Sequence, residues 1–230
     1  MQDMRTKVSK PKHKLPEQLT AKELHEQVPP NWYYQSLKVD PFQKYWHRRR
    51  FEEVLKVLEK VQGEVLDIGC ADGMFSKVIF DGTGAKKLIG IDVLKTSVDW
   101  ANKHWKKQKG MIFKVGDAHK LNFPTSSLSA VFAMEVLEHV HKPVNVFKEV
   151  KRILKKGGYA VFLVPSDSIL FQVIWYLWLH FYPRGWVWRE THIQTYRNNA
   201  LPRMCKEAGF KVEVDKKFNL GMLHLVKVRK

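Results

Sequence analysis

Cysteine and acidic residues are both scarce in this chain of 230 residues. Two cysteines, Cys70 and Cys205, are too few for a disulfide framework or a zinc site, so we expect a reducing, cytoplasmic setting. The 23 Asp and Glu residues are outnumbered by 40 Lys and Arg residues, and the formal net charge is +17. This excess favours anionic partners, either nucleic acid or an anionic membrane surface.

Secretion signals, internal repeats and bilayer-spanning runs are also missing. The N-terminus carries charges but no apolar segment with a cleavage site, which argues against a secretory signal. The apolar run at 169–182 is shorter than the roughly 20 residues that a bilayer span needs. No glycine-rich turn is followed by Gly-Lys-Ser/Thr, which excludes a P-loop.

A strand–turn–helix pattern at residues 64–73 is the most informative segment that is present. Its apolar run contains Asp67 and leads into two glycines, Gly69 and Gly73, four residues apart. Such a turn exposes backbone N–H groups where the next helix begins. The spacing is one residue short of a dinucleotide fingerprint. Acids at Asp67 and Asp72 would repel a pyrophosphate, but they suit a ligand with ammonium and sulfonium charges.

Strand patterns and acids recur downstream. A second strand pattern at 87–92 ends in Asp92, at about the distance from the turn where Rossmann-type folds place a carboxylate on a ribose. Further strand patterns at 111–115, 129–134 and 159–164 alternate with helix patterns. The alternation predicts an α/β fold with a mostly parallel sheet that is covered on both faces.

These segments together resemble class I S-adenosylmethionine-dependent methyltransferases, in the methyltransferase type 11 branch that includes the quinone-biosynthesis O-methyltransferases. The resemblance spans about residues 45–228 and is most specific over 64–164. It implies a Rossmann-like, doubly wound, mostly parallel seven-stranded sheet with an antiparallel last strand, an N-terminal helical extension and an apolar insertion after the fifth strand. It also implies S-adenosyl-L-methionine as cofactor. The implied cofactor-binding residues are Asp67, Gly69, Cys70, Ala71, Gly73, Asp92, Val93, Asp117, Ala118 and Glu135.

Two histidines are candidates for the catalytic base that a hydroxyl acceptor requires. His139 follows the fourth strand pattern, and His192 precedes a helix-like segment at 195–208, as in the family. Glu135, Glu138 and His139 fall at i, i+3 and i+4, so we expect them on one face of a helix. A similar stretch is associated with a divalent metal in quinone O-methyltransferases and occurs without a metal in other type 11 enzymes. We therefore assign no metal ligands from the sequence, and metal binding stays open.

The chain divides into a basic N-terminal arm, residues 1–42, and a methyltransferase domain, residues 43–230. Lysine, proline and polar residues dominate the start of the arm, which favours loose docking. An aromatic cluster between Trp32 and Trp46 either closes a ligand pocket or only fastens the arm to the core. Both interpretations stay open.

The insertion at 166–190 contains the second distinctive segment, the apolar and aromatic run 169–182. This run fits a buried core helix, a lid over an apolar substrate pocket, or a helix that dips into a membrane interface. We favour lid and interface together, because a helix apolar on every face exceeds what a surface helix needs. Either role points to an amphiphilic acceptor.

We therefore predict a methyltransferase for a small, amphiphilic or lipid-like acceptor, with oxygen as the methylated atom. The protein is expected to be cytoplasmic, with peripheral contact to an anionic membrane. An RNA or protein methyltransferase is the first alternative, because of the basic charge, and a non-catalytic cofactor-binding protein is the second. No Asn/Asp-Pro-Pro-Tyr/Phe follows the fourth strand pattern, which argues against methylation of adenine N6 or a glutamine amide. Neither cysteine has a Pro-Cys setting, which argues against cytosine C5 methylation. The sequence indicates no oligomeric state.

Overall fold

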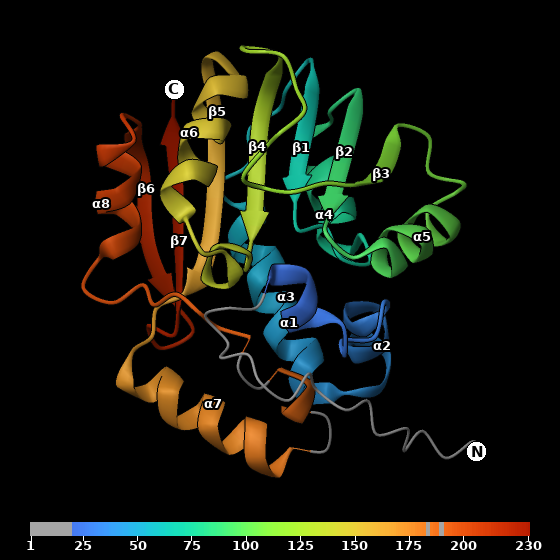
Figure 1. Ribbon diagram of the computed structural model, residues 1–230, viewed down its shortest axis with the longest axis vertical. Helices are drawn as coiled ribbons and strands as arrows, with labels where there is room; N and C mark the ends of the chain where they lie inside the picture. The colour runs from blue at the N-terminus through green and yellow to red at the C-terminus, as the bar shows by residue number, and fades with distance from the viewer. Residues whose placement is uncertain (1–19, 183–184, 189–190) are drawn as a thin grey trace.

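A single seven-stranded sheet forms the centre of the molecule (Figure 1). The computed structural model describes residues 20–182, 185–188 and 191–230. The first 19 residues of the predicted arm, and 183–184 and 189–190 of the predicted insertion, lie outside them. The strands are β1 (Glu64–Ile68), β2 (Lys87–Asp92), β3 (Met111–Val115), β4 (Leu128–Met134), β5 (Leu154–Pro165), β6 (Lys211–Phe218) and β7 (Leu223–Arg229).

The strand order is β3-β2-β1-β4-β5-β7-β6. β1 to β5 run parallel, and β7 is antiparallel to both β5 and β6. The predicted fold is therefore confirmed. Successive strands are added toward one edge from β1 to β3 and toward the other edge from β4 to β6, so the strand order reverses between β1 and β4. Ligands of open α/β sheets bind at such a reversal, beyond the carboxyl ends of the strands.

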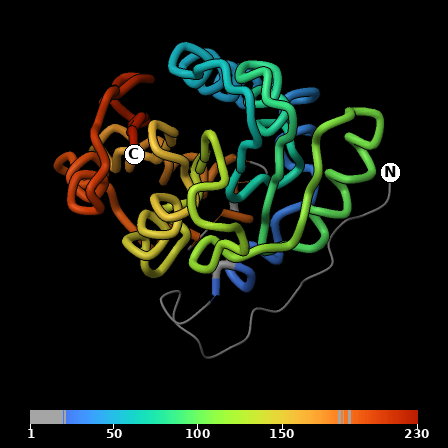
Figure 2. The backbone as a smooth tube through the Cα atoms, turned by 90° about the horizontal axis from the view of Figure 1, so that it is seen from above, coloured from blue at the N-terminus to red at the C-terminus, as the bar shows by residue number. Residues whose placement is uncertain are grey.

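Helices cover both faces of the sheet. They are α1 (Ala21–His25), α2 (Trp32–Val39), α3 (Pro41–Leu55), α4 (Met74–Thr83), α5 (Lys95–His104), α6 (Pro143–Ile153), α7 (Ile169–Phe181) and α8 (Ala200–Glu207), with short 3-10 helices η2 (Leu137–His139) and η3 (Gly185–Trp188). α3, α4 and α5 cover one face and α6 and α8 the other (Figure 2). α1, α2, α3 and α7 gather at the carboxyl ends of the parallel strands (Figure 1).

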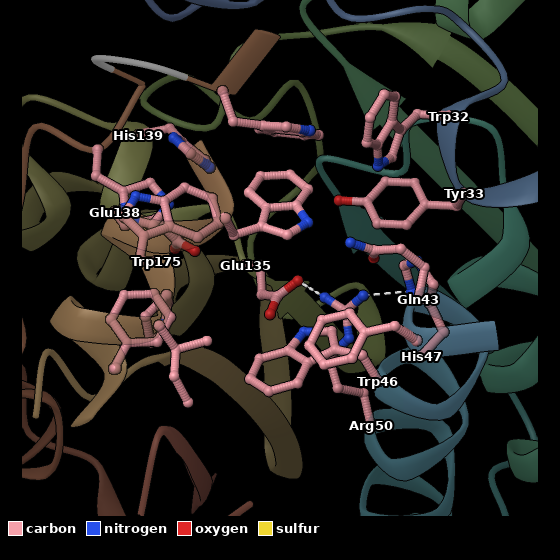
Figure 3. A pocket seen from close by; sticks show the side chains of 17 residues that line it. Trp32, Tyr33, Gln43, Trp46, His47, Arg50, Glu135, Glu138, His139 and Trp175 are labelled. Carbon is pink, nitrogen blue, oxygen red and sulfur yellow. Dashed lines mark hydrogen bonds and ion pairs between the residues drawn. The ribbon is translucent and has the colours of Figure 1, made fainter. Parts of the chain in front are cut away.

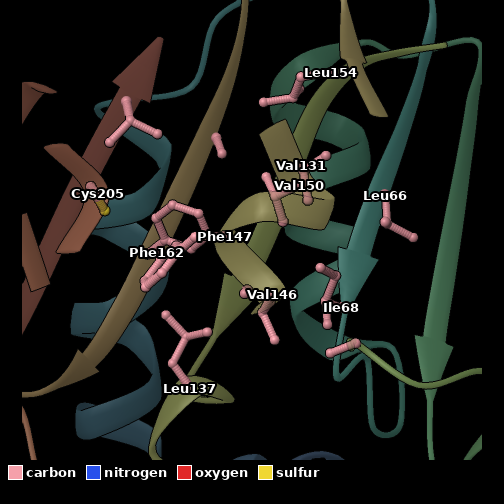
Figure 4. Packing of buried hydrophobic residues seen from close by; sticks show 14 of the residues in the cluster. Leu66, Ile68, Val131, Leu137, Val146, Phe147, Val150, Leu154, Phe162 and Cys205 are labelled. Carbon is pink, nitrogen blue, oxygen red and sulfur yellow. The ribbon is translucent and has the colours of Figure 1, made fainter. Parts of the chain in front are cut away.

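Two apolar cores hold these layers together. Phe147 and Val150 of α6 pack with Phe162 of β5 and Cys205 of α8 on one face (Figure 4). Each large side chain buried there contributes roughly 1.5–3 kcal/mol to folding. β1, β2, β4 and the second part of β5 are buried on both faces, which explains why they read as continuous apolar runs in the sequence, whereas the edge strand β3 is partly exposed.

Two local predictions are wrong. The helix expected from Glu135 onward is reduced to η2, because Glu135 has φ +57° and its N–H donates to the Leu163 carbonyl at 2.7 Å. The late helix does not begin at residue 195, because Asn198 and Asn199 adopt left-handed conformations (φ +52° and +56°) that a helix cannot contain.

α7 forms as the apolar pattern indicates, and Ser168 caps it by accepting the N–H of Phe171 at 3.2 Å. Of its side chains only Phe171 is buried. Within the described part of the chain, no helix combines the length and the hydrophobicity needed to cross a bilayer.

Candidate active site

The glycine turn after β1 is held in a conformation that only glycine adopts easily. Gly69 has φ +69°, and its N–H and that of Cys70 donate to the Ile91 carbonyl at 2.7 and 3.0 Å. A Cβ atom on Gly69 would lie 2.3 Å from Cγ2 of Val136. The turn is thus pressed against the segment after β4, so a larger residue at 69 would force the two apart.

Asp92 at the end of β2 fixes this turn from the other side. Its Oδ2 accepts the N–H of Ala71 and its Oδ1 accepts the N–H of Leu94, both at 2.9 Å. Burial raises the pKa of the Asp92 carboxyl. Each carboxylate oxygen keeps a second lone pair for a ligand hydroxyl, as the predicted ribose contact requires.

A larger cavity of about 600 Å³ opens beside these groups. Its volume lies in the usual range for ligand sites, roughly 300–1,000 Å³. The predicted cofactor residues that line it are Gly69, Ala71, Asp92, Val93, Asp117, Ala118 and Glu135. A glycine turn, a carboxylate after β2 and another carboxylate after β3 are the donor set that S-adenosylmethionine needs, so these residues fit that cofactor. They would hold its methionine part at Gly69, its ribose at Asp92 and its adenine beside Asp117.

The other predicted cofactor residues do not line the larger cavity. Asp67 accepts the hydroxyl of Ser76 at 2.6 Å, and burial raises its pKa to about 7. Cys70 is buried in the core, and Gly73, with φ +77°, is the N-cap residue just before α4. Asp72, which we expected to face the ligand, is buried, and its carboxylate accepts the N–H groups of Met74 and Tyr34. These four residues therefore shape the turn and do not line the cavity.

The N-terminal helices form the outer wall of the larger cavity, which the sequence did not predict in this detail. Lining residues from this segment include His25, Pro29 and Tyr33. Asp72 holds the segment down, because its Oδ2 accepts the N–H of Tyr34 at 2.8 Å. The aromatic cluster was the only sequence signal for this wall.

A smaller cavity of about 100 Å³ adjoins the larger one (Figure 3). Its lining is mostly aromatic and comes from α2, α3, α7, η3 and the segment after β4. The two cavities share five lining residues, which are Trp32, Tyr33, Glu135, His139 and Trp188. A ligand in one cavity therefore meets a ligand in the other across these side chains.

A buried ion pair lies between the two cavities. The Arg50 guanidinium from α3 contacts the Glu135 carboxylate and the Nδ1 of His47 (Figure 3). Burial lowers the pKa of Arg50 to about 10, so it stays charged at neutral pH. The left-handed backbone of Glu135 aims its carboxylate at Arg50, and not toward Glu138 as the helical spacing predicted.

Glu138, His139 and His192 form a second polar cluster, with ligand atoms within 4.8 Å of one another. The structure thus joins both predicted catalytic histidines in one place, and this trio could hold a metal ion. Burial raises the pKa of Glu138 to about 8 and lowers that of His192 to about 4. His139 has a pKa well below its ordinary value, also through burial. Its Nδ1 lies 2.7 Å from the Thr191 carbonyl.

Comparison with known proteins identifies the family. A family model described as a methyltransferase domain matches residues 42–214. A ubiquinone biosynthesis O-methyltransferase from Nitrosospira multiformis is 30% identical over 165 residues, which cover 65% of this chain and 63% of that protein. A sterol 24-C-methyltransferase from Gibberella zeae is 34% identical over 98 residues, which cover 41% of this chain and 26% of that protein. The chain thus spans less than two thirds of the length of these relatives.

A solved structure supports the fold. In the Haloferax volcanii complex between the Trm112 methyltransferase activator and a methyltransferase, a chain superimposes with a TM-score of 0.69 at 17% identity, covering 88% of this chain and 97% of that one. The family model and the fold agree with the glycine turn and the acids that line the larger cavity. The chain therefore belongs to the class I S-adenosylmethionine-dependent methyltransferases of the type 11 branch, with S-adenosylmethionine as its cofactor.

Proposed function

We propose that this protein transfers a methyl group from S-adenosylmethionine to an oxygen atom of a small amphiphilic or lipid-like acceptor. The observation that carries the proposal is the pair of joined cavities, one lined by the glycine turn and the strand-end carboxylates that fit the cofactor, the other small and aromatic. Transfer requires donor and acceptor to be aligned with little solvent between them. The five side chains that the two cavities share are suited to that alignment.

The residues between the cavities supply a base for a hydroxyl acceptor. Bound S-adenosylmethionine supplies a methyl group that its sulfonium already activates. The Thr191 carbonyl can only accept a hydrogen bond, so Nδ1 of His139 carries the ring proton and Nε2 keeps a free lone pair. Nε2 of His139 is thus the atom that takes the acceptor's proton. His192 stacks on Trp175, with ring centroids 4.8 Å apart, and forms an aromatic wall.

An exposed apolar surface on the elements that line the smaller cavity supports an amphiphilic acceptor. Ile169, Val173 and Phe181 of α7 are 82%, 52% and 77% exposed. The hydroxyl of Tyr182, just after α7, contacts the carboxylate of Asp40, so α7 ends beside the junction of α2 and α3. Apart from Leu55 at the last position of α3, the exposed apolar side chains of these elements are Val39, Phe42, Tyr45, Ile169, Leu170, Val173, Tyr176, Leu177 and Phe181, and they are called the apolar face below.

An anionic membrane is the partner that fits the apolar face. α7 contains no charged residue, whereas Lys38, Lys44 and Arg48 are exposed on α2 and α3. Apolar and aromatic side chains beside basic ones are typical of peripheral contact with anionic lipid. We therefore place the protein at the cytoplasmic surface of such a membrane, with Phe42, which lines the smaller cavity, beside the acceptor's entry.

One observation favours an RNA acceptor as the second candidate. Lys103, Lys106, Lys107 and Lys109 are exposed on α5 and the turn after it, and residues 100–116 contain no acid. Such a patch attracts a phosphate backbone. It lies on a different element from the smaller cavity, which makes it the weaker support.

A labelled-methyl assay tests the proposal. The protein is incubated with S-adenosylmethionine carrying a labelled methyl group and, separately, with total lipid extract, bulk tRNA and a protein fraction. We expect the label in the lipid extract, on an oxygen atom of the product. Mild alkaline hydrolysis releases the label from a methyl ester and leaves it on a methyl ether. Label confined to tRNA or protein would refute the lipid acceptor. Tight cofactor binding without any labelled product would support a non-catalytic protein.

A further inference from the structure

Buried polar atoms without a partner gather around the smaller cavity. Seven buried side-chain polar atoms lack a hydrogen-bond partner among the residues that the structure describes. Five of the seven belong to residues that line the smaller cavity, namely Nε2 of His47, Nε of Arg50, Oε2 of Glu138, Nε1 of Trp178 and Nε1 of Trp188. A buried polar group without a partner is costly, so this concentration points to a ligand that completes them.

Four of the five atoms are hydrogen-bond donors. The indole nitrogens of Trp178 and Trp188 and the Nε of Arg50 can only donate. The Nδ1 of His47 faces Nη2 of Arg50, which also only donates, so this Nδ1 accepts. Because burial and the neighbouring Arg50 keep His47 neutral, its one ring proton lies on Nε2, which makes that atom the fourth donor.

The donors come from two walls of the smaller cavity. His47 and Arg50 lie one turn apart on α3, and both are buried. Trp178 belongs to α7 and Trp188 to η3, and their rings lie around the ring of Trp32, with centroids 6.5 and 5.8 Å away. The rest of the lining is largely apolar and includes Phe42, Phe171 and Trp175. Its two carboxyl groups are Glu135, which pairs with Arg50, and Glu138, whose pKa burial raises to about 8.

We infer that the smaller cavity binds the head of an acidic amphiphile, a carboxylate or a phosphate monoester on an apolar chain. Its oxygens accept the N–H groups of His47, Arg50, Trp178 and Trp188, and its chain follows the apolar lining outward. The inference rests on the proposed function, because it names the acid group by which the same site anchors the hydroxyl acceptor; the methylated oxygen remains the hydroxyl. A cationic head would face four donors, and a hydrocarbon alone would leave all four without partners. The net charge of +17 also favours an anionic ligand.

The test compares four eight-carbon probes that differ only in their heads: octanoate, octyl phosphate, octan-1-ol and octylamine. Each is titrated by calorimetry, below its micelle concentration, into the full chain saturated with S-adenosylhomocysteine. We expect octanoate or octyl phosphate to bind about tenfold more tightly than octan-1-ol, as hydrogen bonds to a charged group require, and octylamine not to bind. The two anionic probes distinguish a carboxylate site from a phosphate site. Equal affinity of octan-1-ol and the anions, or binding of octylamine, would overturn the inference without any variant being made.

Conservative variants then assign the donors. Trp178→Phe and Trp188→Phe each remove one indole N–H and keep an aromatic ring, and each should weaken binding of the anionic probe about fivefold or more. Trp175→Phe is the matched control, because Trp175 lines the same cavity and its nitrogen is not among the unpartnered atoms. An equal loss in Trp175→Phe would show that ring size, and not the N–H group, matters.

Failure of this inference is distinguishable from failure of the proposed function. If an anionic probe binds but the labelled-methyl assay gives no lipid product, the proposed reaction is wrong and the head-group site stands. If a lipid product forms but the anionic probes bind no better than octan-1-ol, the reaction stands and the acidic head is wrong.

Discussion

The larger cavity and the smaller cavity are built in opposite ways. The larger one depends on backbone turns directly after β1, β2, β3 and β4, where Gly69, Asp92 and Asp117 stand at the strand ends. The smaller one depends on side chains of α2, α3, α7 and η3, which bring Trp32 and Trp188 together. The cofactor side is therefore fixed by local backbone geometry, and the acceptor side by tertiary packing. The same cofactor site can thus serve different acceptors when only the helices around the second cavity change.

His139 belongs to both cavities, so its substitution gives the largest expected effect. His139→Asn keeps a donor near the Thr191 carbonyl and removes the lone pair at Nε2. Methyl transfer to a hydroxyl acceptor should fall by about 10²- to 10⁴-fold, as loss of a general base does. Affinity for S-adenosylhomocysteine, measured by calorimetry, should stay within about twofold, because Gly69, Asp92 and Asp117, which would hold the cofactor, are unchanged.

A matched control and a chelation arm make the His139 result specific. His180→Asn is the control, since Nδ1 of His180 also bonds a backbone carbonyl, that of Tyr176 at 2.8 Å, but His180 lines neither cavity. Turnover of the wild-type protein should survive prolonged treatment with EDTA. A loss that added Mg²⁺ or Zn²⁺ reverses would instead assign Glu138, His139 and His192 to a metal.

This difference in construction explains how much the sequence could predict. Strand ends, the glycine turn and Asp92 follow from short patterns, because a buried strand, a tight turn and a helix start are each encoded within a few residues. The interior roles of Asp67 and Asp72 were not predictable, because both acids precede a glycine turn and only the packing decides which side they face.

The acceptor side was beyond the sequence for a second reason. Arg50 lies on α3, far along the chain from Glu135, and no spacing rule joins them. The left-handed backbone at Glu135 also breaks the helix that the Glu-x-x-Glu-His spacing implied. The apolar run that became α7 was visible, whereas its mostly exposed position was only one of three interpretations.

Asp92→Ala breaks the cofactor side alone and gives the second largest effect. It removes the acceptor for the N–H groups of Ala71 and Leu94 together with the expected ribose contact. Hydrogen bonds to a charged group contribute about 1.5–3 kcal/mol each, so affinity for S-adenosylhomocysteine should fall about 100-fold. Asp99→Ala, which removes an exposed carboxylate paired with Lys95 on α5, is the control. Unchanged affinity of the Asp92→Ala variant for S-adenosylhomocysteine would refute the role of Asp92 in the site. Binding of this variant to vesicles should match that of the wild type.

Substitutions on α7 break the acceptor side alone, with the smallest expected effect. Val173 and Leu177 lie one turn apart and are each about half exposed, at 52% and 49%. About half of each side chain is thus available to lipid, which corresponds to roughly 1 kcal/mol per residue. Val173→Lys with Leu177→Lys should therefore lower the fraction bound to phosphatidylglycerol-containing vesicles about tenfold in flotation. Ile112→Lys on β3, an edge strand of the sheet, is the matched control, because Ile112 is 39% exposed but outside the apolar face. The added lysines also raise the positive charge, so a membrane contact driven by charge alone would become stronger. Stronger binding of the double variant would therefore refute the apolar face as the membrane contact. Weaker binding with unchanged cofactor affinity would show that the two cavities' regions act independently.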